Sequence, residues 1–222
     1  MKTTVWLIVA IMCCWLSLAS ASTHNDAVLA GLPNNTADVH SSAALVNIPR
    51  TRQFVLEDGD RHYQVMIKLP KDYRHNSTHR YPVVYMTDSM YSLQVVSGAT
   101  RFPMNTNMMQ QAILVAIGYQ RPSKGSASRI RDYTPSHDAS WKLPTGEAKR
   151  HVAFISQVVM PFIEKNYRVD TQQNTFVGNS LGGLLGAYIL LEQPKLFAYY
   201  VLGSPSLWFD NKQLLQQFAQ RF

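Results

Sequence analysis

TFVGNSLGGLLGAYILL, at residues 175–191, predicts a buried strand that turns sharply at Ser180 and leads directly into a helix. Within it, GNSLG at residues 178–182 fits the pattern G-x-S-x-G, in which the serine occupies a strained bend that lifts its hydroxyl above the sheet. A pattern this short arises often by chance, but the apolar strand before it and the helix after it are the context that the chemistry needs. We therefore predict that Ser180 is a nucleophile, the alternative being a structural glycine turn.

A serine that attacks an ester also needs N–H donors for the oxyanion that forms in the transition state. The backbone N–H of Leu181, at the start of the helix, is the first expected donor. The second normally comes from the loop after an earlier strand, and YMTDSMY at residues 85–91 supplies such a loop. We expect the backbone N–H of Met90 to be this donor, although its side chain could also be a packed core group.

The rest of the chain alternates between strand and helix patterns. Runs of apolar, β-branched and aromatic residues predict strands at 61–70, 80–88, 110–119, 174–177 and 197–202. Apolar residues at helical spacing predict helices at 147–167, 181–192 and from Asn211 onward. Pro161 is expected to kink the first of these helices or to start it again. Strands that alternate with helices predict an α/β fold, with a mostly parallel sheet covered by helices on both faces.

The N-terminal part of the chain has the features of an export signal followed by a tether. Residues 1–21 combine a basic residue near the start, an apolar run and a final small triplet, so we expect a secretory signal peptide cleaved after Ala21. The apolar run has about 14 residues, whereas a bilayer-spanning helix needs roughly 20, so no stable membrane anchor is expected. Residues 22–47 have few large apolar groups and predict a flexible segment. The protein is therefore expected in the periplasm or outside the cell, with its folded domain over residues 48–222.

The formal net charge of +7 is spread along the chain without a dense basic run. Nucleic-acid binding requires a clustered patch with interleaved aromatic residues, so no nucleic-acid partner is expected. Both cysteines, Cys13 and Cys14, lie in the expected signal peptide, and the mature protein would therefore contain no thiol.

Four motifs in order resemble the Putative esterase family, whose members are α/β hydrolases related to esterase D and the mycolyltransferases. The motifs are VAIGYQ (115–120), SRIRDYTP (128–135), FVGNSLGGLLGAYILL (176–191) and LGSPSLWFD (202–210). The resemblance runs from Ile48 to Phe222 and is strongest toward exported siderophore esterases that cleave catecholate trilactones. It implies that a serine hydrolyses a carboxylic or thio ester of a small molecule through an acyl-enzyme, without a metal ion or organic cofactor. It also matches the expected donor at Met90, and it differs at Asn179, where relatives have histidine.

The catalytic triad of α/β hydrolases follows the chain order serine, acid, histidine, yet all seven histidines precede Ser180. Asp210 is the only later aspartate, and it comes one strand too early for the usual acid. His137 and His151 are the histidines nearest to the serine in sequence, and both are expected to be solvated surface groups. The interpretation is an α/β-hydrolase domain that is incomplete at its C-terminus and lacks the last strands, the acid and the base. Losing the base can lower the turnover of a serine hydrolase by about 10⁶-fold, so the chain as written is expected to be almost inert.

Three further side chains are candidates for substrate binding. Arg129 and Arg131 could meet an anionic or catecholate group, because a guanidinium offers paired donors and stacks on aromatic rings. Alternatively, Arg131 and Asp132 organise their loop. Trp208 could form a wall of the substrate pocket or could pack against another part of the protein. Two other hypotheses stay open: a non-catalytic protein that binds a ligand without turnover, and a chain whose exposed sheet edge prevents stable folding.

Overall fold

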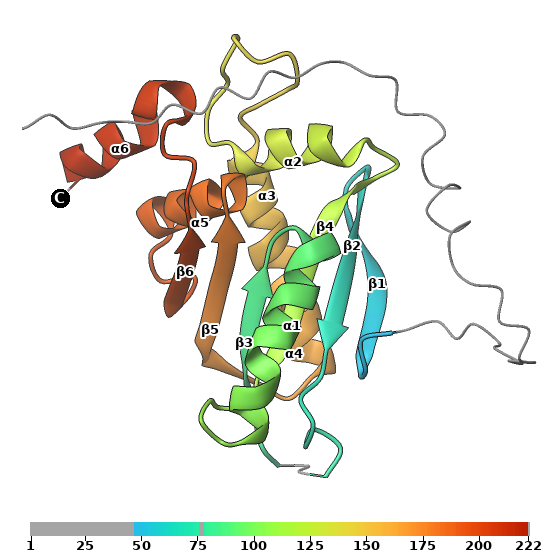
Figure 1. Ribbon diagram of the computed structural model, residues 1–222. Coiled ribbons are helices and arrows are strands. Elements are labelled where there is room, and N and C mark those ends of the chain that lie inside the picture. Colours follow the sequence, from blue (N-terminus) through green and yellow to red (C-terminus); the bar gives the residue numbers. More distant parts are fainter. Residues whose placement is uncertain (1–46, 76–77, 222) are drawn as a thin grey trace, which may run out of the picture. The chain divides into compact units, whose positions relative to one another are not determined.

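The computed structural model describes residues 47–75 and 78–221. They form a six-stranded sheet with helices on both faces (Figure 1). Across the sheet, the strands are ordered β1 (Thr51–Asp58), β2 (Arg61–Lys68), β4 (Ile113–Arg121), β3 (Tyr81–Met86), β5 (Val169–Asn179) and β6 (Tyr199–Gly203). The signal peptide expected at 1–21 lies outside the described residues, and so does the flexible segment expected at 22–47, except for Asn47.

The sheet is mostly parallel, and the predicted α/β fold is confirmed. β1 and β2 form an antiparallel hairpin, β2 is antiparallel to β4, and β4, β3, β5 and β6 all run parallel. The pairing of Met86 with Val177, and of Asn179 with Gly203, brings the carboxyl ends of β3, β5 and β6 together. In open α/β sheets, ligands bind at this edge.

Helices cover both faces of the sheet (Figure 1). The helical segments are α1 (Ser89–Asn105), α2 (Gly125–Tyr133), α3 (Ala148–Phe154), the π-helical turn η1 (Ile155–Val159), α4 (Met160–Asn166), α5 (Leu181–Glu192) and α6 (Phe209–Arg221). α1 packs on one face, whereas α3, η1, α4 and α5 pack on the other. Among the described residues, no helix is both long enough and apolar enough to cross a membrane.

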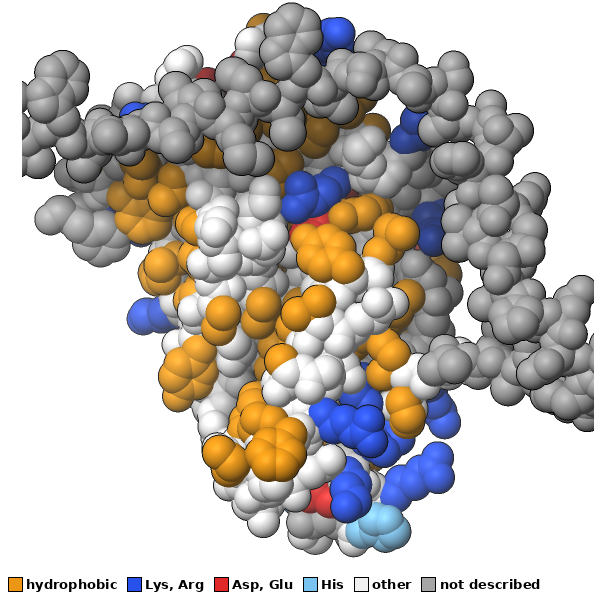
Figure 2. All heavy atoms as spheres, in the orientation of Figure 1, with side chains coloured by type: hydrophobic (Ala, Val, Ile, Leu, Met, Phe, Trp, Pro, Cys, Tyr) orange, Lys and Arg blue, Asp and Glu red, His pale blue; other side chains and the backbone are white. Residues whose placement is uncertain are grey.

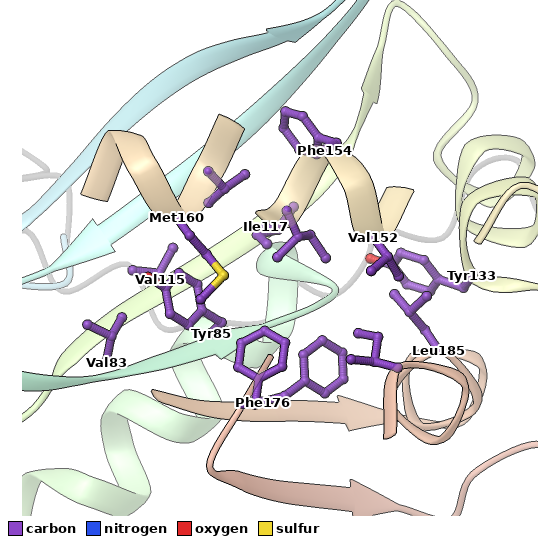
Figure 3. Close-up of a cluster of buried hydrophobic side chains, with 14 of the residues drawn as sticks. Val83, Tyr85, Val115, Ile117, Tyr133, Val152, Phe154, Met160, Phe176 and Leu185 are labelled. Atoms are coloured by element: carbon purple, nitrogen blue, oxygen red, sulfur yellow. The ribbon is translucent and has the colours of Figure 1, made fainter. Parts of the chain in front are cut away.

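The larger core lies between the sheet and the helices α3, η1, α4 and α5 (Figure 3). Tyr85 and Phe176 from the strands meet Phe154 and Leu185 from the helices, and all four side chains are almost fully buried. Burying a large apolar side chain contributes roughly 1.5–3 kcal/mol. This core fixes β5 and α5 relative to each other, and therefore fixes the bend between them.

The helix predicted at 147–167 is present, but it is not continuous. α3 ends at Phe154, η1 adds one π-helical turn, and α4 begins again with Pro161 in its first turn. Proline lacks an N–H and its ring clashes with the preceding turn, so a wider π turn accommodates it. The expected interruption at Pro161 is therefore confirmed.

Three elements, β1, α1 and α2, were not predicted. β1 begins a hairpin whose turn contains Asp58-Gly59, with Gly59 at φ 61°, and an Asp-Gly pair is a known hairpin signal. The loop expected at 85–91 is wrong beyond Asp88, because α1 begins at Ser89. Gly98 and Pro103 lie inside α1 and weaken its helical sequence pattern.

The β6 edge of the sheet is open within the described part of the chain. β6 pairs with β5 alone there, and the side chains of Tyr199 and Val201 are 59% and 57% exposed. Apolar side chains are also scattered over the visible face of α1, β5 and β6 (Figure 2). The exposed edge anticipated from the sequence is therefore present, and the chain nevertheless has an extensive core.

Candidate active site

Ser180 occupies a strained bend between β5 and α5. Its backbone has φ 56° and ψ −117°, a conformation that side-chain-bearing residues rarely adopt. Such strain costs about 1–3 kcal/mol and persists only where the surroundings impose it. Here the N–H of Ser180 donates to the carbonyl of Gly203 (2.9 Å), and its own carbonyl accepts from the N–H of Leu184 (2.9 Å). The bend predicted from the sequence is therefore present and held from both sides.

The glycines on either side of the bend are sterically required. A Cβ at Gly178 would lie 2.2 Å from the carbonyl oxygen of Gly182. A Cβ at Gly182 would lie 2.3 Å from Oγ1 of Thr87 and 3.2 Å from Oδ2 of Asp88. The start of α5 thus lies directly against the end of β3, as the G-x-S-x-G pattern requires.

The two predicted oxyanion donors lie at the same edge of the sheet. Leu181 is the first residue of α5, so its N–H has no partner within the helix. Met90 belongs to the first turn of α1 instead of the expected loop, which likewise leaves its N–H without an intrahelical partner. The Met90 side chain is 63% exposed, so the alternative of a packed core group is wrong. Both helix starts direct positive dipole ends toward the region above β3 and β5.

Ser206 is a neighbour of Ser180 that the sequence analysis missed. The two Oγ atoms are 3.2 Å apart, and the N–H of Ser206 donates to the carbonyl of Ser180 (3.1 Å). Ser206 follows β6 and is 4% exposed. Ser206 lies in the motif LGSPSLWFD, which contributed to the family resemblance but did not by itself indicate a residue of the site.

Asp88 is the centre of a buried polar cluster beneath the bend. Its side chain is 1% exposed in an ion pair with Arg129, whose Nε is 2.7 Å from Oδ1. The hydroxyl of Tyr119 donates to Oδ1 (2.6 Å), and that of Tyr91 donates to Oδ2 (3.0 Å). Burial, reinforced by the Asp88 charge and its hydrogen bond, raises the pKa of both tyrosines. They therefore remain protonated donors across the physiological range.

Arg129 connects this cluster to the bend. Its Nη2 donates to the backbone carbonyl of Asn179 (3.3 Å) as well as to Oδ2 of Asp88 (3.2 Å). Burial opposes the charged form, but the hydrogen bond and charge of Asp88 outweigh it and raise the pKa of Arg129. The guanidinium thus has several internal acceptors.

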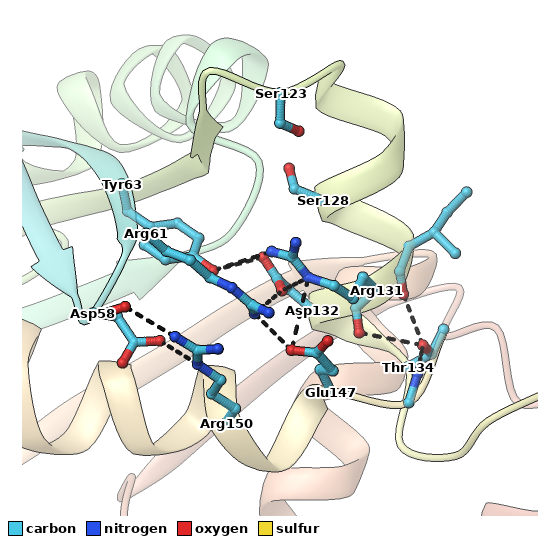
Figure 4. Close-up of polar contacts among 12 residues, drawn as sticks. Asp58, Arg61, Tyr63, Ser123, Ser128, Arg131, Asp132, Thr134, Glu147 and Arg150 are labelled. Carbon is cyan, nitrogen blue, oxygen red and sulfur yellow. Dashed lines mark hydrogen bonds and ion pairs between the residues drawn. The ribbon is translucent and has the colours of Figure 1, made fainter. Parts of the chain in front are cut away.

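Arg131 belongs to a second polar network below α2 (Figure 4). Its Nε lies 2.8 Å from Oδ1 of Asp132, which also accepts from the hydroxyl of Tyr63 through Oδ2 (2.9 Å). Glu147 joins the network through Arg61, at 2.6 Å. Burial, followed by the charge of Asp132, raises the pKa of Tyr63 to about 12. The loop expected around Arg131 and Asp132 is wrong, because both lie in the last turn of α2. Their contacts organise this region, as the alternative to substrate binding had it.

Trp208 and Asp210 lie on the segment after β6. Trp208 is 60% exposed and stacks on Trp141, with ring centroids 6.2 Å apart and an angle of 12° between the planes. Asp210 accepts a hydrogen bond from the hydroxyl of Ser136. The stacked pair holds this segment against the 134–147 loop.

The expectation for His151 is wrong, because its side chain is buried and not solvated. It packs against the rings of Tyr63, Tyr133 and Phe154, and neither ring nitrogen has a hydrogen-bond partner among the described residues. His137 is exposed, as expected. In the described part of the chain, no histidine is hydrogen-bonded to Ser180.

Two hollows flank the start of α1. One, of about 420 Å³, is lined by Met90, Tyr119, residues 120–123 and Gly125, among others. The other, of about 380 Å³, is lined by Tyr91, Val95 and the end of β5. No group of three or more His, Cys, Asp or Glu residues in the described ranges could hold a metal ion.

The sequence is similar to a known family and to curated proteins. Residues 57–220 match the family model described as Putative esterase. Ferri-bacillibactin esterase BesA of Bacillus subtilis is 32% identical over 151 residues, which are 62% of this chain and 52% of that protein. The siderophore triacetylfusarinine C esterase of Aspergillus fumigatus is 29% identical over 179 residues, 78% of this chain and 61% of that protein. The chain therefore spans between half and two thirds of the length of these relatives.

Solved structures share the same architecture. The BES protein from Bacillus cereus has a TM-score of 0.72 at 29% identity, with 81% of this chain and 70% of that chain covered. An IroE-like serine hydrolase from Shewanella oneidensis has a TM-score of 0.68 at 28% identity, with coverage of 77% and 55%. The fold is of the α/β-hydrolase type.

Proposed function

Because the chain belongs to the Putative esterase family, we propose that it is an ester hydrolase in which Ser180 attacks the carbonyl carbon of a carboxylic or thio ester. The observation that carries the proposal is the strained backbone of Ser180 between a buried strand and a helix. Attack forms an acyl-enzyme and expels the alcohol or thiol, and water then releases the acid. The N–H groups of Leu181 and Met90 would stabilise the oxyanion, in a site that needs neither metal nor organic cofactor.

A serine hydroxyl also needs a base to accept its proton. In the part of the chain that the structure describes, the side-chain partner of Ser180 is the hydroxyl of Ser206, which is a poor base at neutral pH. We therefore propose that this chain acylates slowly on its own and turns over little substrate. The strained bend and the two helix starts would still bind and orient an ester.

The names of the relatives support a proposal for the chemical class of the substrate. One is named as an esterase of ferri-bacillibactin, and the other as an esterase of the siderophore triacetylfusarinine C. We propose a siderophore ester as the substrate here, held in the hollow beside Met90 and Tyr119. Arg129, Arg131 and Trp208 remain proposed substrate contacts, although their present partners are protein groups.

The nucleophile is tested with a fluorophosphonate probe and a chromogenic short ester, using intact mass to locate the adduct. The wild-type chain should be labelled slowly, once, at Ser180, with ester turnover close to the buffer rate. Ser180→Ala should abolish labelling, and Ser126→Ala, at an exposed serine outside both hollows, should leave it unchanged. Labelling at another residue would contradict the assignment of Ser180 as the nucleophile. Rapid multiple turnover would contradict the proposed slow acylation.

A second function is a ligand-binding protein without catalysis. The absence of a described base beside Ser180, together with two formed hollows, favours it. It predicts that wild type and Ser180→Ala bind a ferric siderophore with equal affinity and that neither is labelled. Labelling of Ser180 would exclude it.

We also propose that residues 1–21 direct export to the periplasm or the medium and that the mature chain begins at Ser22. N-terminal sequencing of the protein recovered from each cell fraction tests this proposal. A cytosolic protein that retains Met1 would contradict it.

A further inference from the structure

A cavity of about 440 Å³ lies beside the second half of α1. Its walls come from the end of β2, the start of β4, α1 and the residues before β1. Lys68, the last residue of β2, pairs with Leu114 at the beginning of β4, whereas Ser180 follows the carboxyl end of the parallel strand β5. The cavity and the candidate active site are therefore at opposite ends of the sheet. What the cavity binds does not depend on the proposed function.

The cavity is strongly basic. None of its described lining residues is acidic, and four are basic: Arg50, Lys68, Lys71 and Arg101. None of the four forms an ion pair with a described carboxylate. Arg50 Nε and Lys68 Nζ donate instead to the neutral carbonyls of Leu69 (3.2 Å) and Pro49 (2.8 Å). Figure 2 shows basic side chains gathered in the lower part of the molecule.

These charges act on one another. Burial lowers the pKa of Lys68, and the positive charges of Arg50 and Arg101 lower it further. Clustered like charges destabilise a folded protein, and a bound anion relieves the repulsion. Arg50 is also held at φ 60°, and such strained residues cluster at ligand sites.

One wall of the cavity is apolar, and there is open space next to Gly98 of α1, which also lines the cavity. Leu69, Met104 and Leu114 line it. Gly98 lies in the middle of α1, and a Cβ added there would have no neighbour within 4 Å. Glycine is unfavourable inside a helix, and here the missing side chain leaves the cavity open. Its volume is in the range of small-molecule sites, about 300–1,000 Å³.

We propose that this basic cavity binds a small amphiphilic anion. Its phosphate or carboxylate groups would lie among Arg50, Lys68 and Arg101, and its apolar part would lie against Met104 and Leu114. Guanidinium groups bind such oxyanions through paired, charge-assisted hydrogen bonds. The apolar wall distinguishes the expected ligand from an inorganic ion.

Calorimetric titration with hexyl phosphate, inorganic phosphate and the neutral hexyl glucoside tests the proposal. Hexyl phosphate should bind at least tenfold more tightly than inorganic phosphate, and hexyl glucoside should not bind detectably. Arg101→Gln should weaken hexyl phosphate roughly tenfold, as expected for one partly exposed charge-assisted hydrogen bond. Gly98→Leu should abolish binding by filling the cavity, whereas Gly98→Ala should weaken it less.

Lys149→Gln is the matched control, because Lys149 is exposed on α3 outside the cavity. It should leave the affinity unchanged, and circular dichroism should show that all variants are folded. If Gly98→Leu does not fold, Arg101→Gln still decides the question. Equal affinity in Arg101→Gln, Lys149→Gln and wild type would overturn the proposal. Sedimentation with anionic phosphatidylglycerol vesicles, but no binding of hexyl phosphate, would also overturn it, since the ligand would then be a lipid surface.

Discussion

Arg129 joins Asp88 to Asn179, with its Nε 2.7 Å from Oδ1 of the aspartate and its Nη2 3.3 Å from the backbone carbonyl before Ser180. One side chain therefore connects the end of β3, where the oxyanion donor Met90 is expected, to the bend that holds the proposed nucleophile. The aspartate is 1% and the arginine 20% exposed, so solvent screens this pair weakly.

Arg129→Met is expected to destabilise the protein by about 3 kcal/mol, because it leaves the buried carboxylate of Asp88 without its counter-charge. Arg129→Lys keeps the charge but loses the forked geometry, so a smaller loss is expected. Urea unfolding measures both. Arg121→Lys, at an exposed arginine, is the control. An Arg129→Met variant within experimental error of wild type would show that the cluster does not depend on this ion pair.

Gly182→Ala is expected to cost about 1–3 kcal/mol, because the new Cβ would lie 2.3 Å from Oγ1 of Thr87 and overpack the contact between α5 and β3. Removing that oxygen with Thr87→Ala should relieve the clash. The double variant should therefore be more stable than the sum of the two single changes predicts. Gly98→Ala is the control and should stabilise α1 by up to about 1 kcal/mol. Simple additivity between positions 87 and 182 would contradict the steric explanation.

The bend itself was predictable from the sequence, because the apolar strand, the G-x-S-x-G pattern and the apolar helix follow one another directly along the chain. Each of them depends on residues close together in sequence. α1 was not predictable by the same reasoning, since Gly98 and Pro103 disturb its periodicity. The sequence therefore favours a loop around Met90. The contact between Ser180 and Ser206 depends on the pairing of β5 with β6, which joins residues far apart in sequence.

His151 shows a signal that was present but not used. Ala148, Val152 and Ile155 lie on the same side of α3 and η1 and are buried with it. Helical spacing alone therefore placed the imidazole on the apolar face.

Burial lowers the pKa of His151 below its usual value of 6.5, so the folded protein holds the neutral form. Above pH 6.5 the imidazole is neutral in both the folded and unfolded states, and it does not change the stability. As the pH falls below 6.5, the unfolded chain binds a proton that the folded chain excludes, so stability is lost. The slope from this one group is at most about 1.4 kcal/mol per pH unit.

His151→Phe should remove this contribution and, by replacing two unpaired ring nitrogens with carbon, should also stabilise the protein. Its stability advantage should grow as the pH is lowered from 7.5 to 5.0 in urea unfolding experiments. His137→Gln changes an exposed histidine and should follow the wild-type pH dependence. A constant difference between His151→Phe and wild type across this range would rule out the buried neutral imidazole.

The two outer strands of the sheet differ in how they are protected from self-association. β1 has Arg52, Glu57 and Asp58 along its length, and charged side chains discourage edge-to-edge pairing. β6, with the sequence YYVLG, has none, and Tyr199 and Val201 expose their side chains on the same face. Replacing both with lysine should therefore reduce concentration-dependent association in sedimentation velocity experiments. Replacing Gln53 and Val55, two exposed residues on the same face of β1, with lysine adds the same charge and should have little effect. If both changes reduce association equally, general charge repulsion is responsible and the β6 edge has no special role.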